Sequence, residues 1–362
     1  MDHPARRDRL RKALKNTGAE ALLVTSAPNV TYLTGFTGGD SYLLVLATGE
    51  VMISDGRYIT QLEEECPGLE QLIRRPGVKL IDITVRGVRS SRIGRMAIEA
   101  HSMTVAFWDE LAGKLPKLEI LPTTGLVEEL RQCKDKEEIA EIRQAIECAE
   151  SAFSAFRANL RLEMTEKEAA DELDHQLRLR GATEASFPTI VAVGARGALP
   201  HANPTSHRLN EGDTILVDWG ACGRLYKSDL TRVLVAGKIL PKLQRVYEVV
   251  LRAQTQAIAA IRPGVLGKEV DQVARGVIAE AGFGPRFKHG LGHGLGLEVH
   301  ESPLMNATCE VALKPGMVVT VEPGIYLPGW GGVRIEDDVL VTRSGHEVLT
   351  SLSKELGEMI LT

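Results

Sequence analysis

Four carboxylates and one imidazole lie in short motifs that Gly, Pro or Arg punctuates. They are Asp218, Asp229, His293, Glu322 and Glu336. Four ionised carboxylates gathered in one pocket would repel one another and take up protons unless cations stood between them. Two divalent cations would balance the four negative charges, and such a pair can activate water and polarise a substrate carbonyl together. These residues therefore indicate hydrolysis at a two-metal centre.

The ligand types narrow the choice of metal. Carboxylate oxygens with a single imidazole and no thiolate favour manganese, cobalt or zinc, and they do not choose among these three. The sequence therefore predicts two divalent ions whose identity stays open.

Each motif, taken alone, also has a purely structural interpretation. Asp218 in VDWGA could bond the glycine turn that follows it, and Asp229 in KSDLTR could form a surface pair with Arg232. Glu322 and Glu336 differ, because both interrupt strongly apolar runs where an unpaired carboxylate would be costly. A bound metal would remove that conflict.

The segment KHGLGHGLGLEVHESP holds three histidines, His289, His293 and His300. The first two have the spacing of a zinc-binding helix, but the Glu of HExxH is missing and the alternating glycines oppose a helix. The glycines do not match GxGxxG either, which disfavours a dinucleotide loop. Because glycine lets the backbone approach a ligand closely, we expect at least one of these imidazoles to bind metal. Any one of them could instead be a core histidine bonded to a carbonyl.

The sequence predicts two groups of helices and strands, and the second group carries these side chains. The first part alternates helix and strand signals, with an amphipathic segment at 6–15 and apolar runs at 21–24, 41–47 and 51–54. The character changes after residues 121–125, and a long periodic segment from 134 to 160 predicts a helix. The sequence therefore predicts an α/β domain over residues 1–123 and a second domain over 124–362.

In the second domain, helices and strands are expected to alternate around the candidate ligands. Helices are predicted over 165–180, where Thr165 and Glu168 form a capping box, over 241–261 and over 267–281. Segments rich in Val and Ile predict strands over 214–219, 230–235, 317–321 and 333–342. The candidate ligands lie on these strands or at their ends, and alternation places Arg334 and Glu336 on one face.

Composition limits the classes of function. The 362 residues are 44% hydrophobic and 25% charged, which is typical of a globular protein, and the net charge of -5 makes nucleic acid an improbable partner. No apolar run is long enough for a membrane span. The five scattered cysteines suggest neither a disulfide framework nor a thiolate zinc site, so the expected location is the reducing cytoplasm.

The motifs also occur in a telling order: ALPHANP, LVDWGA, SDLTR, HGLGHGLGLEVHE, VEPGIY and GVRIEDDVLVT. This series closely resembles the proline-specific metallopeptidases of the pita-bread fold, the Xaa-Pro dipeptidases (prolidases) and aminopeptidase P enzymes. NVTYLTGFTG and DGRY resemble the N-terminal region of the same family. The resemblance implies an α+β protein, in which an α/β N-terminal domain precedes a pita-bread domain with a curved mixed sheet and helices outside it.

The resemblance also implies how the metal ions are held. The residue matching Asp218 holds one ion, those matching Asp229 and Glu336 bridge both ions, and those matching His293 and Glu322 complete the shell of the other. Glu322 also matches the family's proton acceptor, which takes a proton from the attacking water.

Further positions match residues on the substrate side of the site. They are His201, His289, His300 and Arg334. We expect His300 to stabilise the developing oxyanion or the proline-side carbonyl, and Arg334 to steady the bridging carboxylates or the substrate. The implied substrates are small peptides with proline in the second position, and the family resemblance suggests a homodimer.

Several activities stay open at this point. The compact length leans toward an Xaa-Pro dipeptidase, and the alternative is an Xaa-Pro aminopeptidase that acts on longer peptides. A catalytically inactive peptide-binding module or a metal-free creatinase-like hydrolase should have lost the ligand set that this sequence retains. A methionine aminopeptidase has similar ligands, but the N-terminal region and GVRIEDDV fit the proline-specific relatives better.

Overall fold

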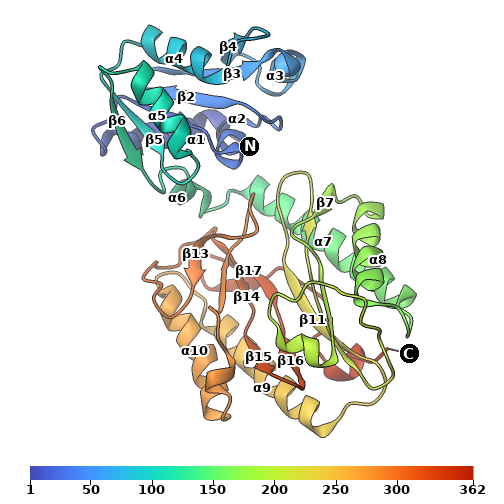
Figure 1. Ribbon diagram of the computed structural model, residues 1–362. Helices are drawn as coiled ribbons and strands as arrows, with labels where there is room; N and C mark the ends of the chain where they lie inside the picture. The colour runs from blue at the N-terminus through green and yellow to red at the C-terminus, as the bar shows by residue number, and fades with distance from the viewer. Residues whose placement is uncertain (362) are drawn as a thin grey trace. The chain divides into compact units, whose positions relative to one another are not determined.

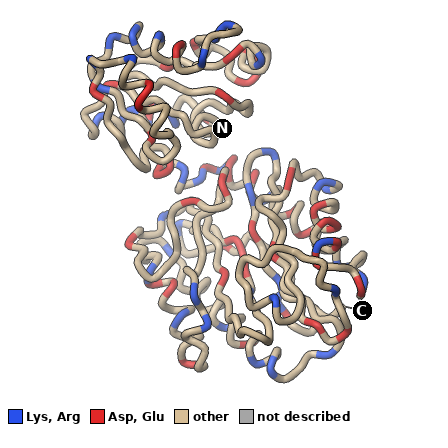
Figure 2. The backbone as a smooth tube through the Cα atoms, viewed as in Figure 1, with Lys and Arg blue, Asp and Glu red and all other residues tan. Residues whose placement is uncertain are grey.

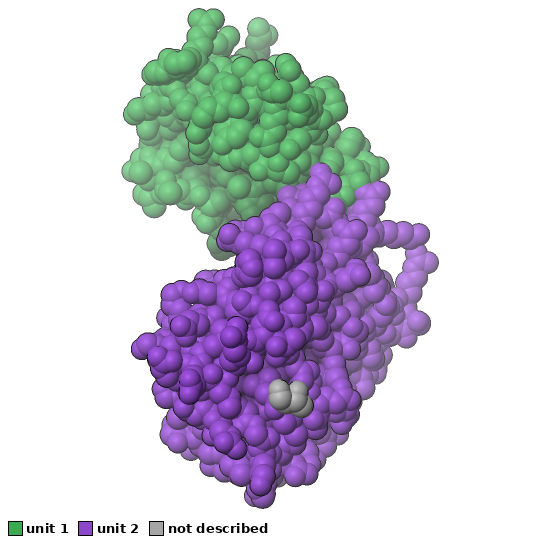
Figure 3. Space-filling model, turned by 90° about the vertical axis from the view of Figure 1, so that its right-hand side faces the viewer, with its two compact units in different colours: residues 1–131 green, residues 132–362 purple. Residues whose placement is uncertain are grey.

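The chain divides into two compact units in the computed structural model, which describes residues 1–361. The units are Met1–Arg131 and Gln132–Thr362, coloured separately in Figure 3. The sequence placed residues 124–131 in the second domain, whereas helix α6 (Glu128–Arg131) belongs to the first unit. Side-chain contacts explain this, because Asn29 Nδ2 donates to Glu128 at 2.6 Å and Arg131 donates to Asn29 Oδ1 at 2.7 Å.

A six-stranded mixed sheet forms the centre of the first unit. The strand order is β4-β3-β2-β1-β5-β6, where β1–β2 and β2–β3 are antiparallel and the other pairs are parallel. The strands are β1 (Ala21–Val24), β2 (Tyr42–Leu46), β3 (Gly49–Asp55), β4 (Glu70–Arg74), β5 (Arg95–Glu99) and β6 (Glu119–Thr123). β1 is buried along its whole length, as expected of a strand that is covered on both faces.

Helices accompany this sheet in the first unit (Figure 1). They are α1 (His3–Lys15), α2 (Ala27–Thr34), α3 (Ile59–Glu65), α4 (Leu80–Ser90), α5 (Val105–Lys114) and the short helix η1 (Gly56–Tyr58). Residues of α4 and α5 share one hydrophobic cluster with Ala21 and Leu23 of β1. The α/β architecture predicted for this part of the chain is confirmed.

Four long helices belong to the second unit. They are α7 (Lys136–Asn159), α8 (Glu166–Leu179), α9 (Pro241–Ala260) and α10 (Gly267–Glu280). Capping boxes begin two of them, Asp135 with Glu138 at α7 and Thr165 with Glu168 at α8, and proline begins α9. The helices predicted at these places are confirmed to within about two residues. The shorter helices are η2 (Gly194–Ala198), η3 (Gly284–Arg286) and η4 (Leu356–Met359).

Two main sheets lie among these helices (Figure 1). One has the order β11-β9-β8 and the other β13-β12-β14-β17-β18, while β10–β7 and β15–β16 form two-stranded ribbons. Their bounds are β7 (Glu184–Ala185), β8 (Ile190–Val193), β9 (Thr214–Trp219), β10 (Ala221–Cys222), β11 (Leu230–Val235), β12 (Gly292–Gly294), β13 (Glu301–Met305), β14 (Val318–Val321), β15 (Gly324–Leu327), β16 (Gly331–Arg334), β17 (Asp337–Val341) and β18 (His346–Val348). The strand pairs are antiparallel, and one parallel bridge joins Val235 to Ile360.

The single strand predicted over 333–342 is wrong, because the chain changes sheets within it. β16 ends at Arg334 and β17 begins at Asp337. Between them, the backbone N–H of Glu336 donates to the carbonyl of Thr231 on β11, at 3.2 Å. This bridge joins the three-stranded sheet to the start of β17, and it places Glu336 at the junction of the two sheets.

Alternating side chains divide the core of the second unit. Val217 and Trp219 of β9 pack in a cluster with α7 and α8, whereas Leu216 belongs to a second cluster with α9 and α10. Trp219 is anchored by stacking on Phe153, with ring centroids 4.1 Å apart. Asp218 therefore projects from the same face as Leu216.

Positions of acidic and basic residues are interspersed along the backbone of both units (Figure 2). Within residues 1–361, no helix is both long enough and apolar enough to cross a membrane.

Candidate metal centre

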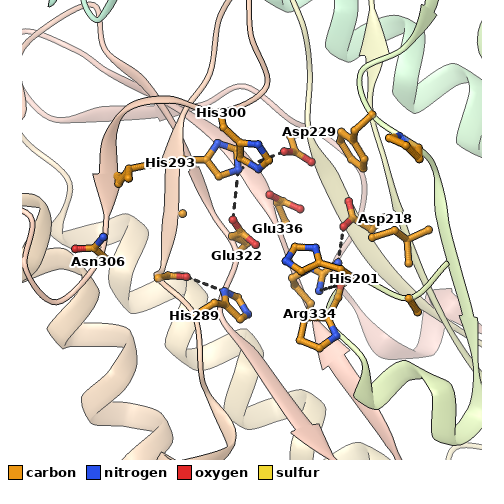
Figure 4. Close-up of a pocket in the computed structure, with 18 of the residues that line it drawn as sticks. His201, Asp218, Asp229, His289, His293, His300, Asn306, Glu322, Arg334 and Glu336 are labelled. Carbon is orange, nitrogen blue, oxygen red and sulfur yellow. Dashed lines mark hydrogen bonds and ion pairs between the residues drawn. The ribbon is translucent and has the colours of Figure 1, made fainter. Parts of the chain in front are cut away.

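All five predicted ligands line one pocket of about 450 Å³ (Figure 4). Asp218 and Asp229 come from β9 and the start of β11, in the three-stranded sheet. His293 lies on β12 and Glu322 comes directly after β14, in the five-stranded sheet, while Glu336 lies at the junction. Residues that are far apart in sequence therefore meet where the two sheets meet.

Three of the five residues converge tightly. One ligand atom each from Asp229, His293 and Glu336 lie within 4.8 Å of one another. His293 Nε2 is 3.5 Å from Asp229 Oδ2 and also 3.5 Å from Glu322 Oε1. Asp218 lies toward the other side of the pocket, beside Arg334 (Figure 4).

His293 is prepared to be a neutral ligand. Burial lowers its pKa to about 4, so the ring is uncharged at neutral pH. Its Nδ1 is 3.1 Å from the carbonyl oxygen of Gly294, and that carbonyl can only accept, so the ring proton sits on Nδ1. The lone pair of Nε2 therefore points toward the carboxylates, which is the arrangement that a metal-binding histidine requires.

The carboxylates need a cation in order to stay ionised. Burial, followed by repulsion from Glu336 and Asp218, raises the pKa of Asp229 well above its usual value. Burial also raises the pKa of Glu336 well above its usual value and that of Glu322 to about 8. Asp218 Oδ1 is buried and has no hydrogen-bond partner within residues 1–361. This set of donors fits divalent cations, which supply the missing positive charge.

Arg334 is fully engaged behind the carboxylates. Its Nη2 forms an ion pair with Asp218, its Nε donates to Thr231 Oγ1 at 3.0 Å, and its Nη1 donates to Tyr326 at 2.8 Å. The side chain is only 3% exposed, so its charge acts on the pocket through these partners. Arg334 is therefore placed to hold Asp218 in position.

The three predicted substrate-side histidines all line the pocket, but they are not equivalent. The ring nitrogens of His289 are both engaged, with Nδ1 2.8 Å from the Gly290 carbonyl and Nε2 2.9 Å from Tyr326 Oη. His201 and His300 are exposed, and the His300 ring lies edge-on to His293 with centroids 4.3 Å apart. His201 and His300 are thus the more accessible of the three.

Two residues behind the pocket escaped the sequence analysis. Thr231 Oγ1 donates to Glu336 Oε2 at 2.6 Å, and Tyr326 Oη joins His289 to Arg334. The period of two along a strand offers a signal for Thr231, which is two residues after Asp229, whereas Tyr326 lies on β15 and Glu322 follows β14, so no such signal links them.

Both units of the chain match models of known families. A model of the creatinase/prolidase N-terminal domain matches residues 6–133, and a model of metallopeptidase family M24 matches residues 140–343. An Xaa-Pro dipeptidase of Pyrococcus horikoshii is 38% identical over 340 residues, which cover 93% of this chain and 94% of that protein.

Solved structures extend the likeness to the whole fold. An Xaa-Pro dipeptidase from Bacillus anthracis has a TM-score of 0.95 at 37% identity, covering 99% of this chain and 100% of that one. An X-Pro aminopeptidase from Thermotoga maritima has a TM-score of 0.89 at 35% identity, covering 97% and 99%. With more than half of its length matched by the family model, the chain belongs to metallopeptidase family M24.

Proposed function

We propose that this metallopeptidase is an Xaa-Pro dipeptidase, which hydrolyses the bond between an N-terminal residue and a following proline. One observation carries the proposal: Asp218, Asp229, His293, Glu322 and Glu336 all line one pocket in a chain whose relatives include named Xaa-Pro dipeptidases over more than nine-tenths of its length. A catalytically inactive module would have no need to keep four carboxylates together, three of them buried, because burying them is costly.

The site would hold two divalent ions, of manganese, cobalt or zinc. Asp218 would hold one ion, Asp229 and Glu336 would bridge both, and His293 and Glu322 would complete the shell of the other. When bound, such ions activate water and polarise the scissile carbonyl. The charge balance supports this assignment, since four carboxylates match two divalent cations.

The chain's own side chains would then move the protons. Bound cations would keep Glu322 ionised, and the carboxylate could then accept the proton of the attacking water and pass it to the leaving proline nitrogen. His300 is exposed in the pocket and can donate to the oxygen on which charge develops. His201 lines the opposite wall and can contact the substrate, while Arg334 steadies Asp218.

A second candidate is an Xaa-Pro aminopeptidase, because the T. maritima structure of that name covers 97% of this chain. The two activities differ in the group attached after the proline residue, since a dipeptide ends there in a free carboxylate and a longer peptide continues with a further residue. We also propose a homodimer that acts in the cytoplasm. The five free cysteines support a reducing compartment.

The decisive experiment compares three peptides on one preparation. The protein, loaded in turn with manganese, cobalt or zinc, is incubated with Ala-Pro, Ala-Pro-Ala and Met-Ala-Ala. Cleavage of Ala-Pro with about two ions per chain by elemental analysis is expected. Preference for Met-Ala-Ala would indicate a methionine aminopeptidase, and inactivity with all three metals would indicate a binding module.

A further inference from the structure

Asn306 lines the pocket, and the sequence analysis gave this residue no role. It comes directly after β13, lines the same pocket as the candidate ligands and is half-buried. Figure 4 shows Asn306 and Asp218 on opposite sides of this pocket. The loop around it is packed closely, because a Cβ at Gly290 would lie 3.0 Å from the Cβ of Asn306. Glycine at 290 thus lets the two backbone segments approach each other.

Hydrogen bonds fix which end of the Asn306 amide is free. The backbone N–H of Thr308 donates to Asn306 Oδ1 at 3.0 Å, and the hydroxyl of Thr308 donates to the same oxygen at 2.9 Å. These bonds identify the oxygen, so the remaining atom is the Nδ2 amino group, which can only donate. Nδ2 has no partner within residues 1–361 and is therefore available to a ligand in the pocket.

The charges of the pocket differ between its two sides. Asp218, Asp229 and Glu336 lie toward one side, where the proposed cations would hold the reacting end of the peptide. Around Asn306 the lining residues are neutral, and Leu304 is 56% exposed there. A peptide bound with its amine near Asp218 and its scissile bond over Glu322 would extend its proline toward Asn306.

No spare cation serves the proline end. Within the described chain, Arg334 is the single Lys or Arg that lines the pocket, and Asp218, Thr231 and Tyr326 already occupy its guanidinium. His289 has both ring nitrogens engaged. Within residues 1–361, Asn306 Nδ2 is thus an unengaged donor beside Leu304, while the unengaged rings of His201 and His300 also line the pocket.

We infer that Asn306 is a specificity-determining residue whose Nδ2 donates to the carboxyl group of the substrate proline, or to the carbonyl when the peptide continues. The inference rests on the proposed function. A neutral donor can bond either a carboxylate or an amide carbonyl, whereas a cation would favour the carboxylate much more strongly. The substrate class therefore includes both Xaa-Pro dipeptides and peptides that extend beyond the proline, with Leu304 offering apolar surface to the extension.

The test compares Ala-Pro with Ala-Pro amide, which differ in the charge after the proline. Asn306→Asp is the sharpest variant, because one carboxylate oxygen can still accept both bonds from Thr308 while the other replaces the donor with a negative charge. We expect Asn306→Asp to raise KM for Ala-Pro at least about tenfold more than KM for the amide. Asn306→Lys should move the same ratio in the opposite direction.

Ala307→Asp is the matched control, since Ala307 is exposed and does not line the pocket. It adds the same charge one residue away and should change the KM ratio by less than about twofold. Metal content and melting temperature of each variant verify that the site is intact.

The outcomes separate the inference from the function on which it rests. If the wild-type enzyme cleaves neither substrate, the proposed function fails, and the inference fails with it. If the wild type cleaves both but Asn306→Asp and Asn306→Lys leave the ratio unchanged, or match Ala307→Asp, only the inference is overturned.

Discussion

Thr231 has one hydroxyl proton, and its position decides how Glu336 is presented. The hydroxyl donates to Glu336 Oε2 at 2.6 Å and accepts from Arg334 Nε at 3.0 Å, and the residue is completely buried. Only a hydroxyl can donate and accept in this way. Thr231 therefore orients a proposed metal ligand and the cation behind Asp218 at the same time.

Thr231→Val keeps the shape of the side chain and removes both hydrogen bonds. We expect metal affinity to fall by about 10- to 100-fold, because residues that orient metal ligands have effects of this size. Thr231→Ser retains the hydroxyl and should recover most of that affinity. Calorimetric titration of manganese into metal-free protein measures this without relying on activity. Equal affinities for wild type and Thr231→Val would show that the hydroxyl does not orient Glu336.

The next residue of β11, Arg232, lies on the opposite face of the strand and connects it to other segments. Arg232 is completely buried, and its Nη2 pairs with Asp337 Oδ1 at 2.8 Å. Its guanidinium also donates to the carbonyls of Glu336 at 2.6 Å and Leu352 at 2.8 Å. One side chain thus ties β11 to the beginning of β17 and to the segment after β18.

Arg232→Met should break this connection while filling a similar volume. Asp337 would lose Arg232 but keep Lys354 and Gln254 as partners, so we expect a loss near the lower end of the about 3–5 kcal/mol that removal of one member of a buried ion pair costs. The control is Arg143→Met, since Arg143 and Glu347 pair at 2.7 Å with side chains 42% and 46% exposed, and such pairs contribute about 0–1 kcal/mol. The denaturation midpoint measures both. A variant Arg232→Met no less stable than Arg143→Met would mean that the pair does not hold these strands.

Local sequence signals predicted the elements that they directly encode. Thr165 and Glu168 mark the start of α8 by forming two hydrogen bonds with nearby backbone. In contrast, α4 has the sequence LIDITVRGVRS, whose Ile, Thr and Val are typical of strands, and it is helical because its apolar face packs on the first sheet. Strands β4, β5 and β6 also went unpredicted.

Part of the candidate site could likewise be predicted from local sequence, and part could not. The motifs revealed the ligand-type residues, whereas the partners of Thr231, Tyr326 and Asn306 depend on contacts between distant segments. Thr231 and Glu336 are 105 residues apart, and no periodicity reports such a pairing. The break between β16 and β17 has the same origin, because it results from the bridge between Thr231 and Glu336.

For the whole molecule, the buried carboxylates link stability to pH when metal is absent. Burial raises the pKa of Glu322 from 4.5 to about 8, so the folded chain binds a proton there that the unfolded chain has lost. The contribution is fully present below pH 4.5 and is lost as the pH rises through about 8. His293 acts in the opposite sense, because its lowered pKa of about 4 costs stability as the pH falls below 6.5.

We therefore expect the melting temperature of chelator-treated protein to fall as the pH is raised from 6.5 to above 8, a window in which His293 makes no contribution. Saturating manganese should raise the melting temperature, and more so at the higher pH, because metal replaces the proton and binds only the native state. Scanning calorimetry at several pH values provides the measurement. A metal-free protein that becomes more stable across this window would contradict the carboxylate assignment.

Because Asp218 and Asp229 come from one sheet and His293 and Glu322 from the other, cations bound as proposed would cross-link the two sheets. Removal of the cations would leave the hydrogen bonds within each sheet and the bridge between Thr231 and Glu336 in place, so we expect it to loosen the contact between the sheets before it affects either sheet. The rigidity of the reaction centre would then depend on how fully its metal sites are occupied.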